Sequence, residues 1–344
     1  MPIEGFQHYQ PRKWLSISSL VACARCPRRY FYSSGCRLIP AEGEHTALKF
    51  GEAIHAALPW ILAGEKGVEQ YIEKYKKENP DLDENSVKIV RAAARPASIA
   101  YSEFMRVWGS TLGDEKRNPE NAKLMLLEYA TSHRPGAGLF TLLQPPVGDI
   151  QVSDSVSPWE VPWAIDIGLD VPLVGRIDGM CKHRDTGEPF GLEFKTSSEM
   201  SARLVVGFEM NNQICGYTLA LRLYTGEPVA GVMLDLIAVQ KKGPSSMSYP
   251  IRVIQHQLED FVQWARFWGQ MILQCEKDQN FPRWYTGCTP YQSFGSPGFM
   301  CEYKNLCQTT DWTKFKDFYK VRADKPFDIG AVKSVKVPEG AVAV

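Results

Sequence analysis

Long apolar runs, an excess of charge of one sign and a phosphate-binding loop are all missing from this 344-residue chain. No apolar run approaches the ~18 residues of a membrane-spanning helix, so we expect no membrane association. Lysines and arginines together number 39, as do aspartates and glutamates, so no overall positive field attracts a polyanion. The motif G-x4-G-K-[S/T] is absent, which predicts that the chain carries no nucleotide-driven motor of its own.

A secretory signal is missing too, because Glu4 and His8 interrupt residues 1–10 and leave no apolar core. We therefore expect a cytoplasmic protein. The chain has nine cysteines, an odd number, and a cytosolic setting argues against a disulfide framework.

Two short apolar segments carry charged residues in a pattern that suggests chemistry. The segment around Glu193 and Lys195 is bounded by turn-prone residues and predicts a strand, which places these two side chains on one face. Residues 173–180 also predict a strand, and a turn at 184–187 would fold it back against the first. That hairpin would bring Asp178 close to Glu193.

Such a hairpin would gather the oxygen ligands that magnesium prefers. The carboxylates of Asp178 and Glu193 and the backbone carbonyl of Phe194 would bind the ion, with water completing its shell. Lys195 would then orient a water or neutralise developing negative charge. A solvated hairpin with an exposed Glu–Lys pair is the alternative interpretation.

Two predicted helices add polar side chains at helical spacing. Residues 50–58 predict an amphipathic helix with His55 in its middle. Gln213 and Tyr217 are four residues apart in a helical run that extends to Leu223, so they share one face and could contact a phosphate or a base. Taken singly, each is also typical of an ordinary helix face.

In order and spacing, Gly51-x3-His55, Gly175-x2-Asp178, Glu193-x-Lys195 and Gln213-x3-Tyr217 resemble the RecB-type nucleases of the PD-(D/E)XK superfamily, over roughly residues 14 to 307. The resemblance implies a restriction-endonuclease-like α/β core, a central mixed sheet flanked by helices, with a helical insertion. It implies Mg²⁺ or Mn²⁺ bound by His55, Asp178 and Glu193, catalysis by Asp178, Glu193 and Lys195, and DNA contacts by Gln213 and Tyr217.

Four cysteines form a second pattern, one near the start of the chain and three in a Gly/Pro/Ser-rich stretch near its end: Cys26, Cys288, Cys301 and Cys307. This arrangement resembles the iron–sulfur subgroup of these nucleases, which includes AddB-type proteins and CRISPR spacer-acquisition nucleases. The resemblance implies a [4Fe–4S] cluster that joins the N- and C-terminal segments, and thiolates are soft ligands that suit it.

Two other interpretations of the cysteines stay open. Cys23 and Cys26 have the C-x2-C spacing of many zinc sites, so Cys23, Cys26, Cys301 and Cys307 could instead hold Zn²⁺. The thiols could also be free and buried, as we expect for Cys36, Cys181, Cys215 and Cys275.

The first 40 residues contain six basic side chains and one acidic side chain. Arg28, Arg29 and Tyr30 belong to this stretch, where cations alternate with aromatic rings. Such a stretch could grip phosphates and stack on bases, so we predict that these three residues contact DNA. A solvated helix face is the alternative interpretation.

The sequence predicts a helix from Leu15 to Tyr32 with a serine cap, and a helical region with a break at Pro59. Trp264, Phe267 and Trp268, at helical spacing, are expected in the core. We divide the chain into a basic N-terminal segment, a helical region, the nuclease core, a cysteine-rich cluster segment and a polar tail: 1–45, 46–135, 136–280, 281–310 and 311–344.

The function expected from the sequence is metal-dependent hydrolysis of DNA by activated water, as an exonuclease or in processing of ends and single strands. Such nucleases serve DNA repair and recombination and occur in bacterial cells and phage-infected hosts, where a separate helicase or recombination protein could assist. The alternatives are a catalytically inactive DNA-binding scaffold and a redox-sensing iron–sulfur protein.

Overall fold

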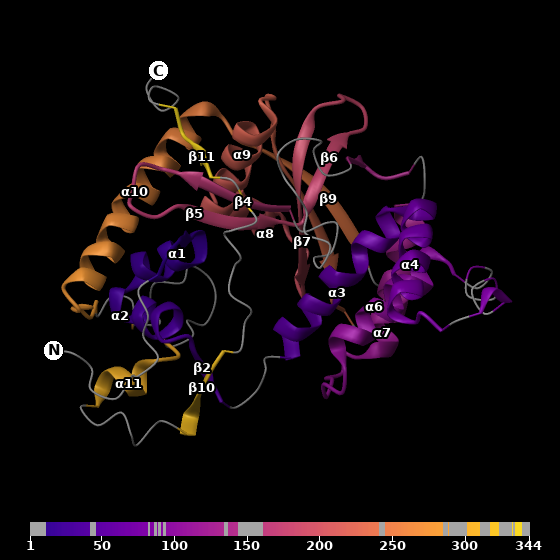
Figure 1. Ribbon diagram of the computed structural model, residues 1–344, viewed down its shortest axis with the longest axis horizontal. Coiled ribbons are helices and arrows are strands. Elements are labelled where there is room, and N and C mark those ends of the chain that lie inside the picture. The colour runs from indigo at the N-terminus through magenta and orange to yellow at the C-terminus, as the bar shows by residue number, and fades with distance from the viewer. Residues whose placement is uncertain are drawn as a thin grey trace. The chain divides into compact units, whose positions relative to one another are not determined.

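The computed structural model divides the chain into two compact units, each described here by itself (Figure 1). One unit, unit 1, combines residues 1–43, 162–175 and 254–344, and the other, unit 2, combines residues 44–161 and 176–253. The structure describes residues 12–41, 46–81, 83–85, 88, 91, 94–133, 137–143, 161–240, 245–284, 288, 301–309, 317–322, 332 and 334–338.

Unit 2 is built on a mixed five-stranded sheet with the order β3-β6-β7-β8-β9. The pair β7–β8 is parallel and the other pairs are antiparallel, so the predicted mixed sheet is confirmed. The strands are β3 (Phe140–Leu143), β6 (Gly179–His183), β7 (Pro189–Ser197), β8 (Gly231–Ala238) and β9 (Ser246–Arg252).

The predicted hairpin forms between β6 and β7. Its turn ends at Gly187, whose φ of +71° is a conformation that glycine adopts without steric cost. The prediction of one strand over 173–180 is wrong in one respect, because the strand is interrupted at Asp178. Residues before Asp178 form β5 (Leu173–Ile177) and residues after it begin β6.

Helices pack on unit 2's sheet and share an aromatic core with it. The core joins Phe50, Phe104 and Trp108 of the helices to Phe190 and Phe194 of β7, all at most 2% exposed. The helices of this region are α3 (Thr46–Leu62), α4 (Gly64–Glu78), α6 (Pro96–Trp108) and α7 (Pro119–Ser132).

Pro59 does not break its helix, contrary to the sequence prediction. Proline lacks an N–H, so the carbonyl of His55 loses its usual helical partner. The carbonyl of Pro59 nevertheless accepts the N–H of Ala63 at 2.9 Å, and α3 continues to Leu62. Burial of Pro59 in the core compensates for the missing bond.

The helical run after β7 contains two helices, α8 (Ala202–Glu209) and α9 (Asn212–Thr225). The second begins at Asn211, whose side chain accepts the N–H of Gln213 at 2.8 Å, as expected for a helix cap. It ends at Gly226 in the left-handed conformation. This cap fixes Gln213 in the first turn of α9.

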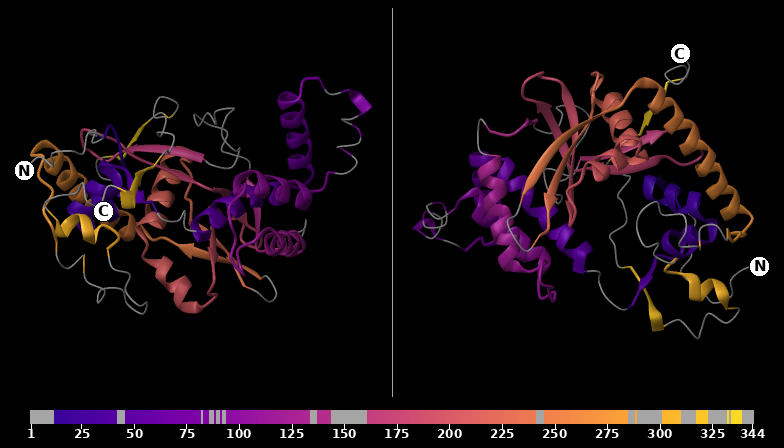
Figure 2. Two further views of the ribbon diagram at one scale, coloured as in Figure 1. Left: turned by 90° about the horizontal axis from the view of Figure 1, so that it is seen from below. Right: turned by 180° about the vertical axis from the view of Figure 1, so that it is seen from behind.

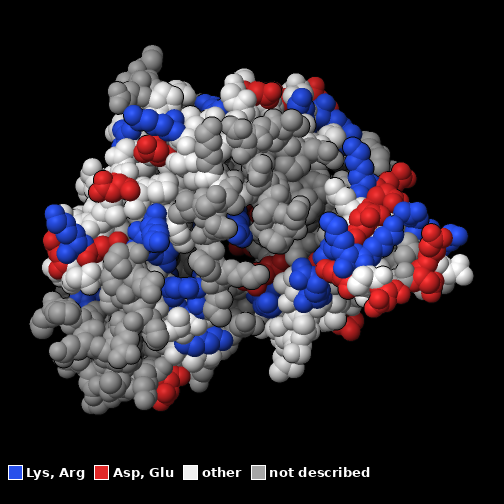
Figure 3. Space-filling model, in the orientation of Figure 1, with Lys and Arg blue, Asp and Glu red and all other residues white. Residues whose placement is uncertain are grey.

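Charged side chains on α4 largely pair with neighbours of opposite sign. Lys74 contacts Glu103 at 2.8 Å and Lys76 contacts Glu73 at 2.9 Å. Figure 3 shows cationic and anionic atoms interleaved over this part of the chain. This helix therefore presents mixed charge, in keeping with the zero net charge of the sequence.

Unit 1 gathers segments that are far apart in the sequence, as the N-terminal and C-terminal colours of Figures 1 and 2 show. Helix α1 packs on α10, and a small sheet has the order β1-β5-β4-β11. Besides β5, the elements are β1 (Leu15–Ser16), α1 (Ile17–Arg25), α2 (Pro27–Tyr30), the π-helix η1 (Phe31–Gly35), β2 (Leu38–Pro40), β4 (Val161–Asp166), α10 (Gln255–Lys277), α11 (Lys304–Gln308), β10 (Tyr319–Val321) and β11 (Val335–Lys336).

Three sequence predictions about unit 1 need correction. The helix expected from Leu15 to Tyr32 is divided at Cys26, whose backbone is extended, although Ser16 caps it as predicted. Phe267 is 56% exposed and so does not belong to the core, while Trp264 and Trp268 are half-buried. The predicted tail contributes β10, which pairs with β2, and β11, which pairs with β4. None of the helices that the structure describes is both long and apolar enough to cross a membrane.

Candidate active site

The predicted catalytic side chains come together in unit 2 because β6 and β7 are antiparallel neighbours. Gly179 pairs with Leu192, so Asp178, one residue before β6, lies next to the middle of β7. Glu193 and Lys195 are two residues apart on β7 and share a face. The hairpin geometry expected from the sequence is therefore present.

Asp178 is fixed by the backbone of the neighbouring strand. Its Oδ2 accepts the N–H of Phe194 at 2.8 Å and lies 3.6 Å from Nδ1 of His55. His55 comes from α3, and its ring meets the ring of Phe194 edge to face with centroids 6.0 Å apart. Both polar side chains keep partial exposure, 31% for His55 and 21% for Asp178, so they line a surface that solvent reaches.

Glu193 is the deepest member of the site, at 3% exposure. Its Oε1 accepts hydrogen bonds from Nζ of Lys195 and from Nε2 of Gln213, the latter at 3.1 Å. Its Oε2 is buried and has no hydrogen-bond partner among the residues that the structure describes. A buried carboxylate oxygen without a donor is costly, because it has lost its water and gained nothing in return.

The electrostatics of Glu193 reflect this environment. Its pKa is raised to about 7, first by burial and then by the carboxylate of Asp178, against the lowering effects of Lys195 and His55. The nearby cations therefore fall short of stabilising two adjacent carboxylates. An additional cation would balance the negative charge of the two carboxylates, whose oxygens could also serve as its ligands.

Gln213 and Tyr217, predicted to contact DNA, contact each other and the site. Nε2 of Gln213 lies 2.6 Å from the hydroxyl of Tyr217 and also reaches Glu193. Tyr217 is 7% exposed. Gln213 thus orients the Glu193 carboxylate, a contact that the motif spacing did not predict, and the DNA contacts of both residues stay a prediction.

The basic and aromatic residues near the N-terminus make contacts within unit 1. Nε of Arg28 donates to the carbonyl of Phe281 at 2.7 Å, and Arg29 pairs with Glu302 at 3.3 Å. Tyr30 is fully buried and its hydroxyl donates to Glu276 at 2.7 Å. The ring of Tyr30 is therefore shielded from solvent in this structure, and its contact with DNA stays a prediction.

The four predicted cluster cysteines are neighbours in unit 1. The pKa of Cys307 is raised to about 11, first by burial and then by the other three thiols, led by Cys301. Burial likewise raises the pKa of Cys288, with Cys26 adding to the effect, and that of Cys301, with Cys288 adding to it. By contrast, burial raises the pKa of Cys23 to about 12 with help from Cys275 and Cys26. Cys288 thus interacts with all three other members of the predicted set.

Among the residues that the structure describes, no three His, Cys, Asp or Glu side chains are arranged so that they could hold a metal ion. This applies to His55, Asp178 and Glu193 and equally to the cysteine group. The residues still suit a cation at the first site, because the unpartnered Oε2 of Glu193 and the Asp178 carboxylate are the hard oxygen donors that Mg²⁺ prefers.

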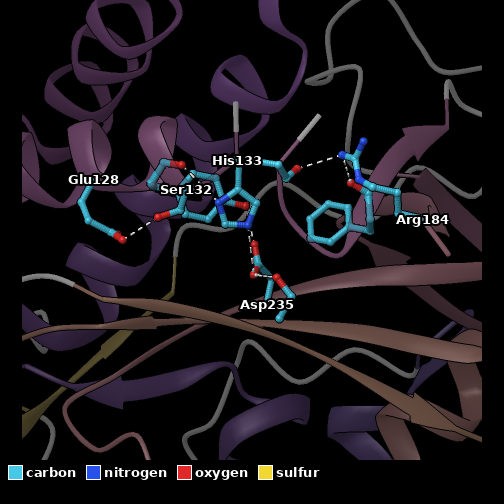
Figure 4. A network of polar contacts seen from close by, with 9 residues as sticks. Glu128, Ser132, His133, Arg184 and Asp235 are labelled. Atoms are coloured by element: carbon cyan, nitrogen blue, oxygen red, sulfur yellow. Dashed lines mark hydrogen bonds and ion pairs between the residues drawn. The ribbon is translucent and has the colours of Figure 1, made fainter. Parts of the chain in front are cut away.

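A second buried carboxylate, which the sequence analysis missed, lies on β8. Asp235 is 0% exposed, and its two oxygens accept hydrogen bonds from the hydroxyls of Tyr129 and Ser248, the latter at 2.8 Å. Nε2 of His133 lies 3.7 Å from it, and the Tyr129 and His133 rings stack at 3.9 Å (Figure 4). One signal was present in the sequence: Asp235 is the single charged residue in the apolar run 229–239.

Comparison with known families supports the interpretation of the geometry. The model of the PD-(D/E)XK nuclease superfamily matches residues 14–308 of the chain. No curated protein matches the chain. The match confirms the resemblance at the level of the superfamily, and the mixed α/β architecture is consistent with a restriction-endonuclease-like fold.

Proposed function

The chain belongs to the PD-(D/E)XK nuclease superfamily, and on that premise we propose that it hydrolyses phosphodiester bonds of DNA with the help of Mg²⁺ or Mn²⁺. The observation that carries this proposal is Glu193, a buried carboxylate with one oxygen unpartnered, beside Asp178 and Lys195. Glu128 and Glu259 also have one buried oxygen without a hydrogen-bond partner among the described residues, so what distinguishes Glu193 is its position beside Asp178 and Lys195.

Asp178, Glu193, His55 and the backbone carbonyl of Phe194 would hold the divalent cation. When bound, the cation would supply positive charge that stabilises the developing charge on the phosphate. Glu193 must be ionised for this, so its proton, held with a pKa of about 7, leaves when the cation arrives.

The protein's own side chains contribute orientation and charge. Gln213 and Lys195 both bind Oε1 of Glu193, which fixes the carboxylate plane and turns Oε2 away from them. Lys195 is 30% exposed, so its ammonium can also meet a phosphate oxygen at the surface of the site. Its role is to neutralise charge or to orient the attacking water.

We propose further that the substrate is a DNA end or a single strand. The test is cleavage of end-labelled single- and double-stranded DNA with Mg²⁺, Mn²⁺ or EDTA, comparing wild type with Lys195→Ala. Lys182→Ala, which removes an exposed lysine of β6, is the matched control. Cleavage that requires metal, persists in the control and vanishes in Lys195→Ala supports the proposal, and the product ladder gives polarity.

Intact DNA with every protein and metal would contradict the proposal. If DNA then bound equally well with and without Mg²⁺, the chain would be a scaffold. If it did not bind and a reversible iron–sulfur potential were found, a redox function would replace it.

A second proposal concerns the cysteines: Cys26, Cys288, Cys301 and Cys307 hold an iron–sulfur cluster. Its support is that these thiols raise one another's pKa, whereas the thiols that raise the pKa of Cys23 are Cys275 and Cys26. That difference favours Cys288 over Cys23 as the fourth ligand. Loading requires the thiols to lose their protons.

Anaerobically purified protein should then be brown and contain iron and acid-labile sulfide. Cys301→Ala should lose the brown colour and melt at a lower temperature. Cys36→Ala, which removes a buried cysteine of the same unit outside the set, should keep the colour and the melting temperature of wild type. Zinc in place of iron, or colour retained by Cys301→Ala, would overturn the assignment.

A further inference from the structure

Helix α3, which carries His55, is held between a helix and a strand. On one side the ring of Phe50 meets Phe104 at 5.5 Å and Trp108 at 5.7 Å, both edge to face on α6. All three rings are at most 2% exposed. Because this packing is close, α3 has little freedom to move away from β7.

On the other side, α3 meets β7 at Gly51 and, one helical turn later, at His55. A Cβ atom placed on Gly51 would lie 3.2 Å from Oγ1 of Thr196, which is tighter than most contacts that a Cβ atom makes, so one of the two would have to shift by a few tenths of an ångström. His55 is four residues further along α3, and Phe194 is two residues back along β7, so both lie on the same faces as this contact. The close approach at Gly51 therefore lies beside the His55–Asp178 pair.

We propose that Gly51 is a positioning residue: its missing side chain sets the depth at which α3 packs on β7, and thereby holds His55 at the metal-binding carboxylates. The proposal rests on the proposed nuclease function for its consequence in metal binding. A side chain at position 51 would press against Thr196 and lift this turn of α3. His55, 3.6 Å from Asp178, would then recede from the site.

A role in fold stability alone predicts something different. With that role alone, Gly51→Ala would lower the melting temperature of the metal-free protein and leave its affinity for Mn²⁺ unchanged. We expect instead a melting temperature close to that of wild type, because the higher helix propensity of alanine offsets the cost of the contact with Thr196. The affinity of Gly51→Ala for Mn²⁺, measured by calorimetry, should nevertheless fall about tenfold, the size of effect seen when a residue that orients a metal ligand is changed.

The contact with Thr196 provides the decisive variant. Thr196→Ala removes the Oγ1 atom that the new methyl group would meet, so Gly51→Ala/Thr196→Ala should regain wild-type Mn²⁺ affinity, and Thr196→Ala alone should bind normally. Gly207→Ala on α8 is the matched control, because a Cβ there meets nothing within 4 Å. It should bind Mn²⁺ as wild type does.

A second measurement separates this inference from the proposed function. In metal-free protein, the imidazole NMR resonances of His55 should shift in Gly51→Ala, stay in place in Gly207→Ala, and return in the double variant. Wild-type protein that binds no Mn²⁺ would refute the metal site, and the His55 resonances alone would then decide the inference. Unchanged His55 resonances in Gly51→Ala, unchanged Mn²⁺ affinity where wild type binds the ion, or failure of Thr196→Ala to restore either, would overturn it.

Discussion

Two buried carboxylates on neighbouring strands differ in how their oxygens are satisfied. Glu193 on β7 and Asp235 on β8 are 3% and 0% exposed. Both oxygens of Asp235 accept hydroxyl hydrogen bonds and His133 lies nearby. Within the described part of the chain, by contrast, Oε2 of Glu193 has no hydrogen-bond partner. Although the two carboxylates are similarly buried, described side chains donate hydrogen bonds to both oxygens of Asp235 but to only one oxygen of Glu193.

The register of the sheet explains why two such residues coexist. Asp235 pairs with Phe194, so both side chains project to the same face of the sheet. This face packs against α3, α6 and α7, and α7 supplies Tyr129. Glu193 precedes Phe194 and projects to the opposite face, beside Gln213 of α9. Burial alone therefore does not identify a functional carboxylate. An unpartnered oxygen is informative only together with the neighbouring side chains, because Glu128 and Glu259 also have one among the described residues.

The largest expected effect is on catalysis. Glu193→Gln should lower the cleavage rate by roughly a thousandfold, because a carboxylate that acts in the reaction is lost. The free energy of unfolding should not fall, because glutamine carries no charge to bury. Single-turnover cleavage and urea unfolding measure the two quantities, with the exposed Glu227→Gln as control. A Glu193→Gln protein that is active but unstable would reverse the comparison.

The complementary change at Asp235 should act on stability. Asp235→Asn weakens the bonds from Tyr129 and Ser248 and removes the charge facing His133, so it should lower the free energy of unfolding by about 2–3 kcal/mol. The cleavage rate of the folded fraction should stay within about threefold of wild type. Loss of activity at full stability would show that Asp235 serves the reaction directly.

Titration of Glu193 gives an effect on stability with a defined sign. Its pKa is raised to about 7 from an ordinary 4.5, so between these values the folded protein keeps a proton that the unfolded chain has lost. The free energy of unfolding of metal-free protein should therefore fall as the pH rises from 4.5 to 7, and level off above that range.

Affinity for Mn²⁺ should change in the opposite direction over the same range, since only the carboxylate binds the ion. Urea unfolding in EDTA and calorimetric titration check the two trends, each taken as the difference from Glu193→Gln. Parallel pH profiles for wild type and variant would mean that Glu193 does not titrate here.

The smallest predicted effect concerns one hydrogen bond to Asp235. Tyr129→Phe deletes the hydroxyl that donates to Asp235 and should cost about 1–2 kcal/mol of unfolding free energy, with no change in cleavage. Tyr71→Phe, a half-buried tyrosine on α4, should cost less. Equal costs for both would show that Asp235 gains little from Tyr129.

Local patterns predicted much of this structure. Alternation around Glu193 and the turn at 184–187 correctly indicated the β6–β7 hairpin. These features depend on neighbours in the sequence, which is why they can be read from it. The proximity of Asp178 to Glu193 followed from the same hairpin.

Contacts between distant segments could not be read in this way. Tyr30 was expected to contact DNA because its hydrogen-bond partner, Glu276, is 246 residues away and no local pattern indicates their contact. The bond between Gln213 and Glu193, and the fit of Gly51 against Thr196, likewise depend on how a helix is placed on a strand. Periodicity identifies a face of an element without identifying what covers it.

The discontinuous make-up of unit 1 has a consequence for synthesis on the ribosome. Its first helix, α1, packs on α10, and β2 pairs with β10, so the partners of residues 17–40 are made only after residue 254. Unit 2 is complete by residue 253 and can fold while the rest of the chain is still being translated. The N-terminal segment must wait with its apolar face uncovered, and we expect it to complete its packing last, because contacts between segments this far apart in the sequence form slowly.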